Sequence, residues 1–339
     1  MPDKKISIRD IAEKSGVSVA TVSRVINQNG RYSAETEARV RQIMEEYNYV
    51  PNLLARGLRQ QQVPEIGIIV PDITNEFFGR LVVQIESELF EHGYTLTICN
   101  TNEDRMIERR YLEMIRAKQM CGLIRISHEH LREEELIDIP TVYLDRIPEN
   151  IKYTGQCISV ESDHEQGGYI ATKELIKQGC RNVGIVLHDA EISTKAHEMR
   201  YIGYKRALEE ANIEFDVKKV IRVKRADCQN GGRAALEFIE RRGLPDGLFC
   251  TSDLLAVGAL DEFLKHGVNV PGQVRIVGYD NISLAKMMMI PITTISHPEH
   301  TMVDITCRYF LSAFAKEESE LQKKKRIVLP VELIKRETA

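Results

Sequence analysis

Five residues near the N-terminus carry side chains that can contact DNA: Val19, Ala20, Thr21, Ser23 and Arg24. Thr21 and Ser23 have hydroxyl groups that can bond phosphate oxygens or base edges, and Arg24 has a guanidinium that can bond a phosphate or a guanine. Val19 and Ala20 are small, apolar side chains that can contact thymine methyl groups. On one helix, these residue types would allow DNA to be read. The alternative is an ordinary helix with solvated polar residues.

The surrounding sequence predicts short helices that would position this run. Apolar residues share one face of residues 7–14, and a break follows at residues 15–17. A second helix begins at Ser18, a good N-cap, and runs to about residue 27. A third helix fits residues 33–47, whose first turn carries acidic side chains that suit the helix dipole. Two short helices joined by a glycine-containing turn form a helix-turn-helix, whose second helix enters the major groove of DNA.

From Glu65 onward, short apolar runs alternate with amphipathic segments. This alternation predicts parallel sheets with helices on both faces. The runs are too many for one simple sheet, so we expect two α/β lobes, with any ligand outside the carboxyl ends of the strands. The predicted strands are 66–70, 95–99, 122–126, 141–144, 158–160, 183–187, 220–223, 248–251 and 275–278. The predicted helices include 78–91, 106–118, 164–177, 199–211, 228–241 and 254–265.

Charge and cysteine usage narrow the class of protein. The first sixty residues carry ten Lys/Arg against seven Asp/Glu and the other 279 carry 36 against 43, so a segment of charge +3 precedes one of −7. A basic segment on an acidic body is compatible with binding of a polyanion. The seven cysteines are scattered singly without a C-x-x-C pair, which favours reduced, buried thiols over zinc or redox sites. No metal or cofactor is therefore expected.

Other classes of protein fit the sequence less well. No apolar stretch approaches the ~20 residues that span a bilayer, and the first ten residues lack the apolar core of a secretory signal, so we expect a cytoplasmic protein. Two-lobed α/β bodies also host kinases and dehydrogenases, but the chain has no glycine-rich phosphate-binding motif, nucleophile elbow or H-E-x-x-H pair. A transport-type binding protein would carry a signal peptide and no DNA-binding unit.

The run from Ser7 to Asn27 resembles the N-terminal signature of the LacI/GalR family of transcription regulators. The likeness continues through residues 39–40, 49–52, 55–59, 66–72 and 278–280, so it covers the whole chain. It implies a homodimer that binds palindromic double-stranded DNA. The residues expected to contact DNA are Ser18, Val19, Ala20, Thr21, Ser23, Arg24, Asn27, Asn52, Ala55, Arg56 and Leu58.

The resemblance also implies a hinge helix at residues 52–59 that orders only on DNA and lies in the minor groove. Leu58 matches the position of a leucine that wedges into the central base step. An apolar wedge kinks DNA at the cost of unstacking, which added contacts offset. Gly57 weakens the isolated helix by roughly 1 kcal/mol relative to Ala, which suits an element that must melt and re-form. The alternative is a flexible linker with a chance leucine.

The remainder of the chain resembles the periplasmic sugar-binding fold that this family shares, with an effector in the cleft between two lobes. Residues 75–78 are similar to the family's N-P-F-F segment, and Phe78 matches an aromatic position of the cleft. Asp145 and Asp280 follow predicted strands and match acidic positions that accept hydrogen bonds from hydroxyl groups. Arg200 matches an arginine that binds ring or hydroxyl oxygens. A polyol requires such groups, since an unpaired buried hydroxyl costs about 1–3 kcal/mol.

Three positions depart from the family's pattern. Glu76 replaces the usual proline, Ser252-Asp253 stands where Asn-Asp is common, and His297 lies where a glutamine is common. The shorter hydroxyl of Ser252 would suit an effector of different shape. For the acidic and arginine positions, and for Ser252 and His297, the alternative is a capped turn or a surface contact. The basic run 323–326 is interpreted as a solvated strand edge rather than a second nucleic-acid contact.

These observations predict a sequence-specific transcription regulator, a repressor of a carbohydrate-utilisation operon that a sugar or sugar phosphate releases. A corepressor-dependent or global regulator of the same fold is an alternative, and a sugar-processing enzyme is another. Residues 77–114 most resemble repressors of sucrose or ribose operons. The expected domains are a helix-turn-helix at 1–50, a hinge and linker at 51–63, and an effector-binding and dimerisation domain at 64–339, with lobe 1 at about 64–159 and 293–320 and lobe 2 at about 160–292 and 321–339.

Replacing the wedge residue tests the hinge assignment. Leu58→Ala should reduce DNA bending and operator affinity, because the side chain that unstacks the central base step is lost. Sugar affinity should stay unchanged, since the substitution lies outside residues 64–339. Bending is measured by fluorescence energy transfer across a doubly labelled DNA. Unchanged bending and affinity would contradict the hinge assignment.

Overall fold

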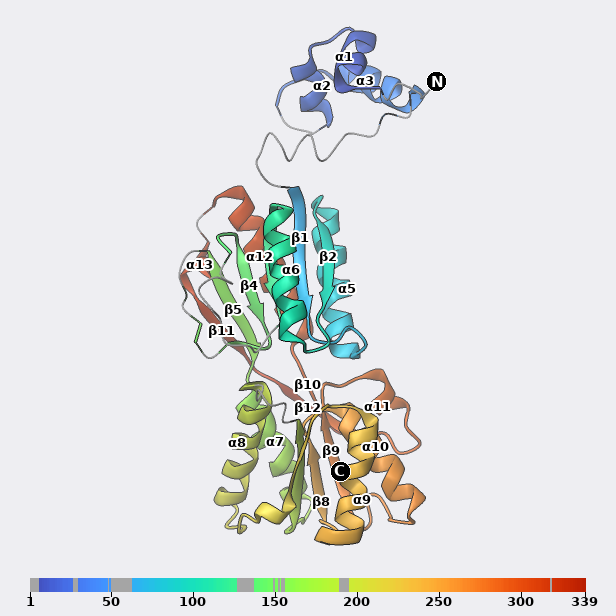
Figure 1. Cartoon of the computed structure of the whole chain (residues 1–339), viewed down its shortest axis with the longest axis vertical. Coiled ribbons are helices and arrows are strands. Elements are labelled where there is room, and N and C mark those ends of the chain that lie inside the picture. The colour runs from blue at the N-terminus through green and yellow to red at the C-terminus, as the bar shows by residue number, and fades with distance from the viewer. Residues whose placement is uncertain are drawn as a thin grey trace. The chain divides into compact units, whose positions relative to one another are not determined.

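The computed structural model describes residues 6–26, 30–47, 49, 63–126, 137–148, 150–151, 153, 156–188, 195–317 and 319–339. The chain divides into two compact units, Met1–Val63 and Pro64–Ala339 (Figure 1). The predicted hinge helix, with Asn52, Ala55, Arg56 and Leu58, lies outside the described residues, as does Asn27.

The N-terminal unit contains α1 (Ile8–Ser15), α2 (Val19–Ile26) and α3 (Ala34–Glu46). A capping box between Ser7 and Asp10 begins α1, and Gly16 ends it at a φ of 68°, in the left-handed region that glycine adopts without strain. The three helices share a small core of Ile11, Ala12, Val22, Val25 and Val40. The predicted helix-turn-helix is thus confirmed.

Lobe 1 of the second unit is built on a six-stranded sheet in the order β11-β5-β4-β3-β1-β2. Its adjacent strands run parallel in the registered pairs β1–β2, β3–β4, β4–β5 and β5–β11. Helices α5 and α12 pack on one face of this sheet and α6 on the other. Successive residues of a strand point to opposite faces, so Ile68 packs in the core with α5 and α12, and Ile69 packs in the core with α6. The elements are β1 (Val63–Val70), α5 (Glu76–Glu91), β2 (Thr95–Asn100), α6 (Arg105–Ala117), β3 (Met120–Arg125), β4 (Thr141–Leu144), β5 (Cys157–Ser162), α12 (Glu299–Ala315), α13 (Glu320–Lys323) and β11 (Arg326–Leu329).

Lobe 2 repeats this plan with a sheet in the order β12-β10-β9-β8-β6-β7, in which only the edge pair β10–β12 is registered as antiparallel. Helices α7 and α8 cover one face, and α9 and α10 cover the other. The elements are α7 (His164–Lys177), β6 (Val183–His188), α8 (Lys195–Glu210), η2 (Val217–Lys219), β7 (Val220–Val223), α9 (Cys228–Glu237), η3 (Phe238–Arg242), β8 (Gly247–Cys250), α10 (Asp253–Lys265), β9 (Arg275–Tyr279), α11 (Ser283–Met287), β10 (Thr293–Ser296) and β12 (Glu332–Ile334). The predicted two-lobed fold with parallel sheets is confirmed.

The predicted boundaries between the lobes are wrong at three places. Strand β10 belongs to lobe 2, because it pairs with β9 and places Ile295 in the lobe 2 core. Strand β11 belongs to lobe 1, because it pairs with β5 and packs Ile327 against the lobe 1 core. Residues 160–162 also belong to lobe 1, as the end of β5. The basic run 323–326 leads into β11, which is an edge strand, as the interpretation of a strand edge expected.

Two glycines allow α7 and α8 to pack unusually closely. A Cβ atom on Gly168 would lie 2.0 Å from the carbonyl oxygen of Arg200, and one on Gly203 would lie 2.0 Å from that of Glu165. Because both obstacles are backbone atoms, the helices would have to separate to admit a methyl group. The close packing therefore fixes the position of α8 and of Arg200 on it.

We expect Gly203→Ala to destabilise the protein by about 1–3 kcal/mol, since the added methyl group meets the backbone of α7. Gly232→Ala on α9 is the matched control, because the nearest atom to its Cβ lies 3.5 Å away. The control should be neutral or gain roughly 0.5–1 kcal/mol from the better helix former. Urea unfolding at one protein concentration measures both. Equal effects of the two substitutions would contradict the close packing.

Candidate functional site

Helix α2 carries the described residues that were predicted to contact DNA. Its inner face buries Val22 and Val25, whereas Ala20 and Arg24 are exposed. The Ser18 hydroxyl accepts a hydrogen bond from the Thr21 amide at 3.1 Å, so Ser18 caps the helix. The remaining predicted residues of α2, Val19, Thr21 and Ser23, are half-buried.

The second group of predicted residues gathers where strands of both lobes end. Asp145 follows β4 of lobe 1 and Asp280 follows β9 of lobe 2. Both have positive φ angles, 61° and 110°, in a region that non-glycine residues rarely adopt. Such strain, on the order of 1–3 kcal/mol per residue, is held only where surrounding structure enforces it, and it concentrates at functional sites.

His297, at the end of β10, lies between these two carboxylates. Its Nε2 is 3.2 Å from Asp280 Oδ1, and its Nδ1 is 3.6 Å from Asp145 Oδ1. The same Nδ1 shares a hydrogen bond of 2.7 Å with the Ser162 hydroxyl. The ring of Phe77 stacks on the imidazole with centroids 4.0 Å apart. The imidazole is thus fixed on both edges and on one face.

Arg200 of α8 lies on the lobe 2 side of the same cluster. Its Nη1 donates to the Thr251 carbonyl at 2.5 Å and lies 3.8 Å from Asp280 Oδ1. The guanidinium carbon is 3.6 Å from the centre of the Tyr279 ring, a close cation–π contact. Arg200 is therefore held in place by its neighbours, with its charge beside Asp280.

Some buried polar atoms of this cluster have no hydrogen-bond partner among the residues that the structure describes. They are Asp145 Oδ1, Arg200 Nε and the Tyr279 hydroxyl. Each such buried group costs about 1–3 kcal/mol unless another donor or acceptor satisfies it. The cluster thus combines an unused acceptor with unused donors, which is the complement of a molecule with several hydroxyl groups.

Charges in the cluster shift the titration of its acids in opposite directions. Burial alone would raise the pKa of Asp145, but the neighbouring His164, His297 and Arg200 outweigh burial and hold this pKa well below its ordinary value. Burial and the charge of Asp280 raise the pKa of Asp253 well above its ordinary value. Asp145 therefore stays ionised inside the protein.

Three predicted effector residues do not join the cluster directly. Both oxygens of Asp253 are engaged, Oδ1 by the Thr294 hydroxyl at 2.6 Å and Oδ2 by the Ile282 amide at 2.9 Å. Ser252 caps α10 by accepting from an amide three residues later. The centre of the Phe78 ring lies 5.0 Å from the guanidinium carbon of Arg146. Asp253 thus holds the segment after Asp280 in place through its hydrogen bond from the Ile282 amide.

The structure also brings in residues that the sequence analysis missed. His164 begins α7, its Nε2 lies 3.4 Å from Asp145 Oδ1, and its Nδ1 lies 3.3 Å from Arg200 Nη2. Phe77 and Ser162 contact His297 as described above, and Tyr279 lies beneath Arg200. A usable signal existed for His164, because it follows a strand end just as Asp145 does.

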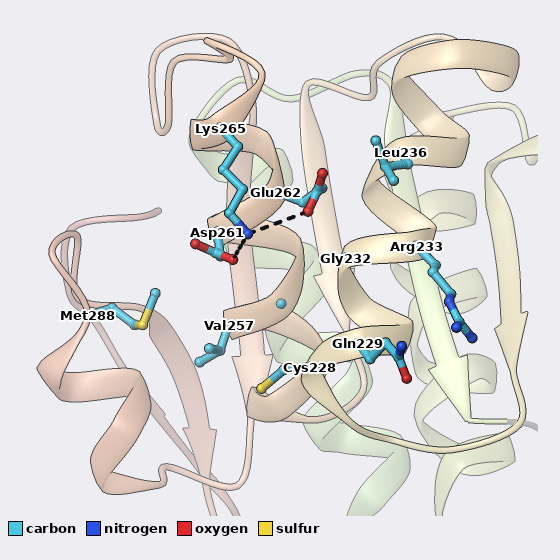
Figure 2. Close-up of a pocket in the computed structure, with 11 residues that line it drawn as sticks. Cys228, Gln229, Gly232, Arg233, Leu236, Val257, Asp261, Glu262, Lys265 and Met288 are labelled. Atoms are coloured by element: carbon cyan, nitrogen blue, oxygen red, sulfur yellow. Dashed lines mark hydrogen bonds and ion pairs between the residues drawn. The ribbon is translucent and has the colours of Figure 1, made fainter.

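Two surface cavities lie in the second unit. One, of about 420 Å³, reaches the cluster at His297 and is also lined by Arg80, Asn281 and Glu299. The other, of about 610 Å³, lies between α9 and α10 and contains no predicted site residue (Figure 2). Figure 2 shows Lys265 paired with Asp261 and Glu262 on its rim. Only the first cavity adjoins the cluster.

Metal-ligand groups, thiols and long apolar helices are the remaining features of the described part of the chain. There, no group of three or more His, Cys, Asp or Glu residues could hold a metal ion. Burial raises the pKa of the Cys99 thiol to about 11 and that of Cys121 to about 12. Such thiols stay protonated and unreactive near neutral pH. Among the described helices, none is long and apolar enough to cross a bilayer.

Comparisons with known proteins agree with this organisation. Residues 7–52 match the family model of bacterial regulatory proteins, lacI family, and residues 172–339 match the periplasmic binding protein-like domain. The ribose operon repressor of Halalkalibacterium halodurans is 34% identical over 98% of this chain and 96% of its own length.

Solved structures also resemble the whole chain. The complex of the transcriptional regulator CelR with cellobiose has a TM-score of 0.71 at 26% identity, over 98% of this chain and 100% of that one. The lac repressor dimer bound to operator and the anti-inducer ONPF has a TM-score of 0.82 over 99% of both chains, and at 22% identity it shows likeness of fold alone.

Asp145→Asn should destabilise the protein by about 3–5 kcal/mol at neutral pH, because it removes a buried, ionised carboxylate that His164 and His297 contact and that the charge of Arg200 attracts. The lowered pKa of Asp145 means that its contribution is present above its unfolded pKa, near 3.9, and is lost as the pH falls further. Urea unfolding of both proteins from pH 7 to pH 3 should therefore show a difference that shrinks at the acid end. A difference that stays constant with pH would contradict this account.

Proposed function

Because the chain belongs to the LacI family of bacterial regulatory proteins, we propose that it represses a carbohydrate-utilisation operon and that a sugar or sugar phosphate releases it from DNA. The chain is a DNA-binding transcription regulator, not an enzyme. The proposal covers the genes that the protein regulates, the effector that it binds in the cleft, and the residues that make each contact.

The cluster of Asp145, Arg200, Asp280 and His297 is the observation that carries the effector proposal. It lies at the carboxyl ends of strands from both lobes, where ligands bind in open α/β sheets. Its unused buried acceptor and donors match the alternating needs of sugar hydroxyl groups. Phe77 offers an aromatic face beside them. A polyol could satisfy these groups without adding a net charge.

The two carboxylates bear on the choice between a sugar and its phosphate. A phosphate placed between Asp145 and Asp280 would meet two negative charges in a buried site, with Arg200 as the closest guanidinium. Like charges at such distances repel strongly when water is excluded. This favours a free sugar at the centre of the cluster. Ribose and cellobiose, which the names of two similar proteins mention, are the first sugars to test.

We place DNA contact on α2, at Ser18, Val19, Ala20, Thr21, Ser23 and Arg24, with the predicted hinge residues adding minor-groove contacts. A palindromic operator calls for two copies of the chain related by a two-fold axis. A homodimer interface would bury apolar side chains, and the second unit offers candidates, because Met287 and Met289 are 77% and 88% exposed and Val83 and Phe90 on α5 are also exposed. We place this activity in the cytoplasm, where bacterial operator DNA lies.

The sense of regulation has two candidates. In induction the sugar weakens operator binding, and in corepression it strengthens it. The relative named as a ribose operon repressor favours induction, because operons for sugar use are needed when the sugar is present. Measurement of operator affinity with and without sugar decides between them.

Asp280→Asn should remove the sugar response and keep operator binding, because it takes away the charge that orders Arg200 and His297 and leaves α2 untouched. Arg24→Ala is the converse variant and should weaken operator binding by about 1–3 kcal/mol while keeping sugar affinity. The operator is obtained by selection from random DNA with the wild-type protein. Calorimetry with ribose, cellobiose and their phosphates measures effector affinity. A normal sugar response of Asp280→Asn would show that the effector binds elsewhere.

A further inference from the structure

Helix α5 of lobe 1 contacts lobe 2 through Glu76 in its first turn. The Glu76 carboxylate accepts from the Ser283 amide, with Oε2 at 2.8 Å and Oε1 at 3.0 Å, and from the Ser283 hydroxyl at 2.8 Å. Ser283 begins α11, three residues after Asp280. One carboxylate of lobe 1 thus holds the start of a lobe 2 helix with several hydrogen bonds.

Arg80, one turn along α5, contacts the same segment of lobe 2. It pairs with Glu76 and with Glu299, whose Oε1 is 2.5 Å from Arg80 Nη2. Its guanidinium also donates to the carbonyl oxygens of Asp280 at 3.1 Å and Asn281 at 3.3 Å. The Glu76 and Arg80 side chains are about one-third exposed, so water only partly screens these contacts.

Asp280 is therefore held from two directions. Its carboxylate faces His297 and Arg200 in the cluster, while its carbonyl oxygen accepts from Arg80 of the other lobe. A change in the position of Asp280 on effector binding must alter the contacts of Arg80. Movement of α5 must, in turn, alter the placement of Asp280.

We propose that Glu76 and Arg80 form a clamp between the lobes that positions Asp280 for the effector and couples occupancy of the cluster to α5. This inference rests on the proposed function in assigning the effector to that cluster. The clamp depends on a carboxylate at position 76. A proline at this position would have no side-chain oxygen and could not accept from Ser283.

Position 76 offers a variant that removes the carboxylate without disturbing the helix. Glu76 is the first residue of α5, where a proline fits because the amide there has no partner within the helix. Asn75 before it has φ −71° and ψ 117°, a conformation that a following proline favours. Glu76→Pro should fold normally and lose only the contacts to Ser283 and Arg80.

Sugar binding and operator release test the coupling. With the sugar that binds the wild type, Glu76→Pro should weaken sugar affinity about fivefold or more and bring the ratio of operator affinities with and without sugar towards one. Ser283→Ala should act in the same direction, and the double variant should be no worse than Glu76→Pro alone, because the hydroxyl has already lost its partner. Operator affinity without sugar should stay within about twofold. Glu86→Gln removes a charge from an exposed site of α5 and should change nothing.

Amide hydrogen exchange of the sugar-free protein tests the clamp independently of the effector. Glu76→Pro and Ser283→Ala should each speed exchange both at the start of α5 and in α11, whereas Glu86→Gln should not. If no sugar binds the wild type but exchange changes in both segments, the proposed function fails and the contact between the lobes stands. If each variant speeds exchange only in its own segment, or if Glu76→Pro leaves sugar affinity and operator release unchanged, the clamp is overturned.

Discussion

Two carboxylates, Asp145 of lobe 1 and Asp280 of lobe 2, are buried away from water within reach of one histidine, and the organisation of the second unit follows from that constraint. A buried charge is tolerated only with a partner and hydrogen bonds. His297 shares a hydrogen bond with Asp280 and lies 3.6 Å from Asp145, and Arg200 and His164 bring further donor groups beside the two acids. The close packing of α7 and α8 and the strained backbone at both acids hold these partners at contact distance. A fold with looser packing between α7 and α8 would not hold these side chains at contact distance from the two carboxylates.

Local sequence patterns were sufficient to predict the helices of the N-terminal unit and the alternation of strands and helices beyond it. They failed where the partner of a strand lies far along the chain. Strand β10 is four residues long with three hydroxyl side chains, so its pattern does not resemble a buried strand, and only its pairing with β9 shows which lobe it joins. Strand β11 was recognised as strand-like, but the sheet that receives it depends on β5, more than 160 residues earlier. Pairing over such distances leaves no local trace.

The candidate site was predictable to a similar degree. Asp145, Arg200, Asp280 and His297 were named from their positions after strands and from resemblance, and they meet in one cluster. Phe78 was preferred to Phe77, although Phe77 is the ring on His297, because successive residues at a helix start cannot be oriented from sequence alone. Ser252 and Asp253 follow a strand end as the others do, yet their side chains are used by a helix cap and by Ile282 and Thr294. The DNA contacts assigned to α2 and to residues 52–58 remain predictions.

The chain passes between the lobes at three places in the described residues, from β5 to α7, from β10 to α12 and from β11 to β12. Each lobe is consequently a discontinuous domain, and no single cut of the chain releases either one intact. Three covalent connections across one boundary restrict how far the lobes can separate or slide more than a single connection would. A molecule bound between the lobes therefore acts on two bodies that are already tethered to each other at three points.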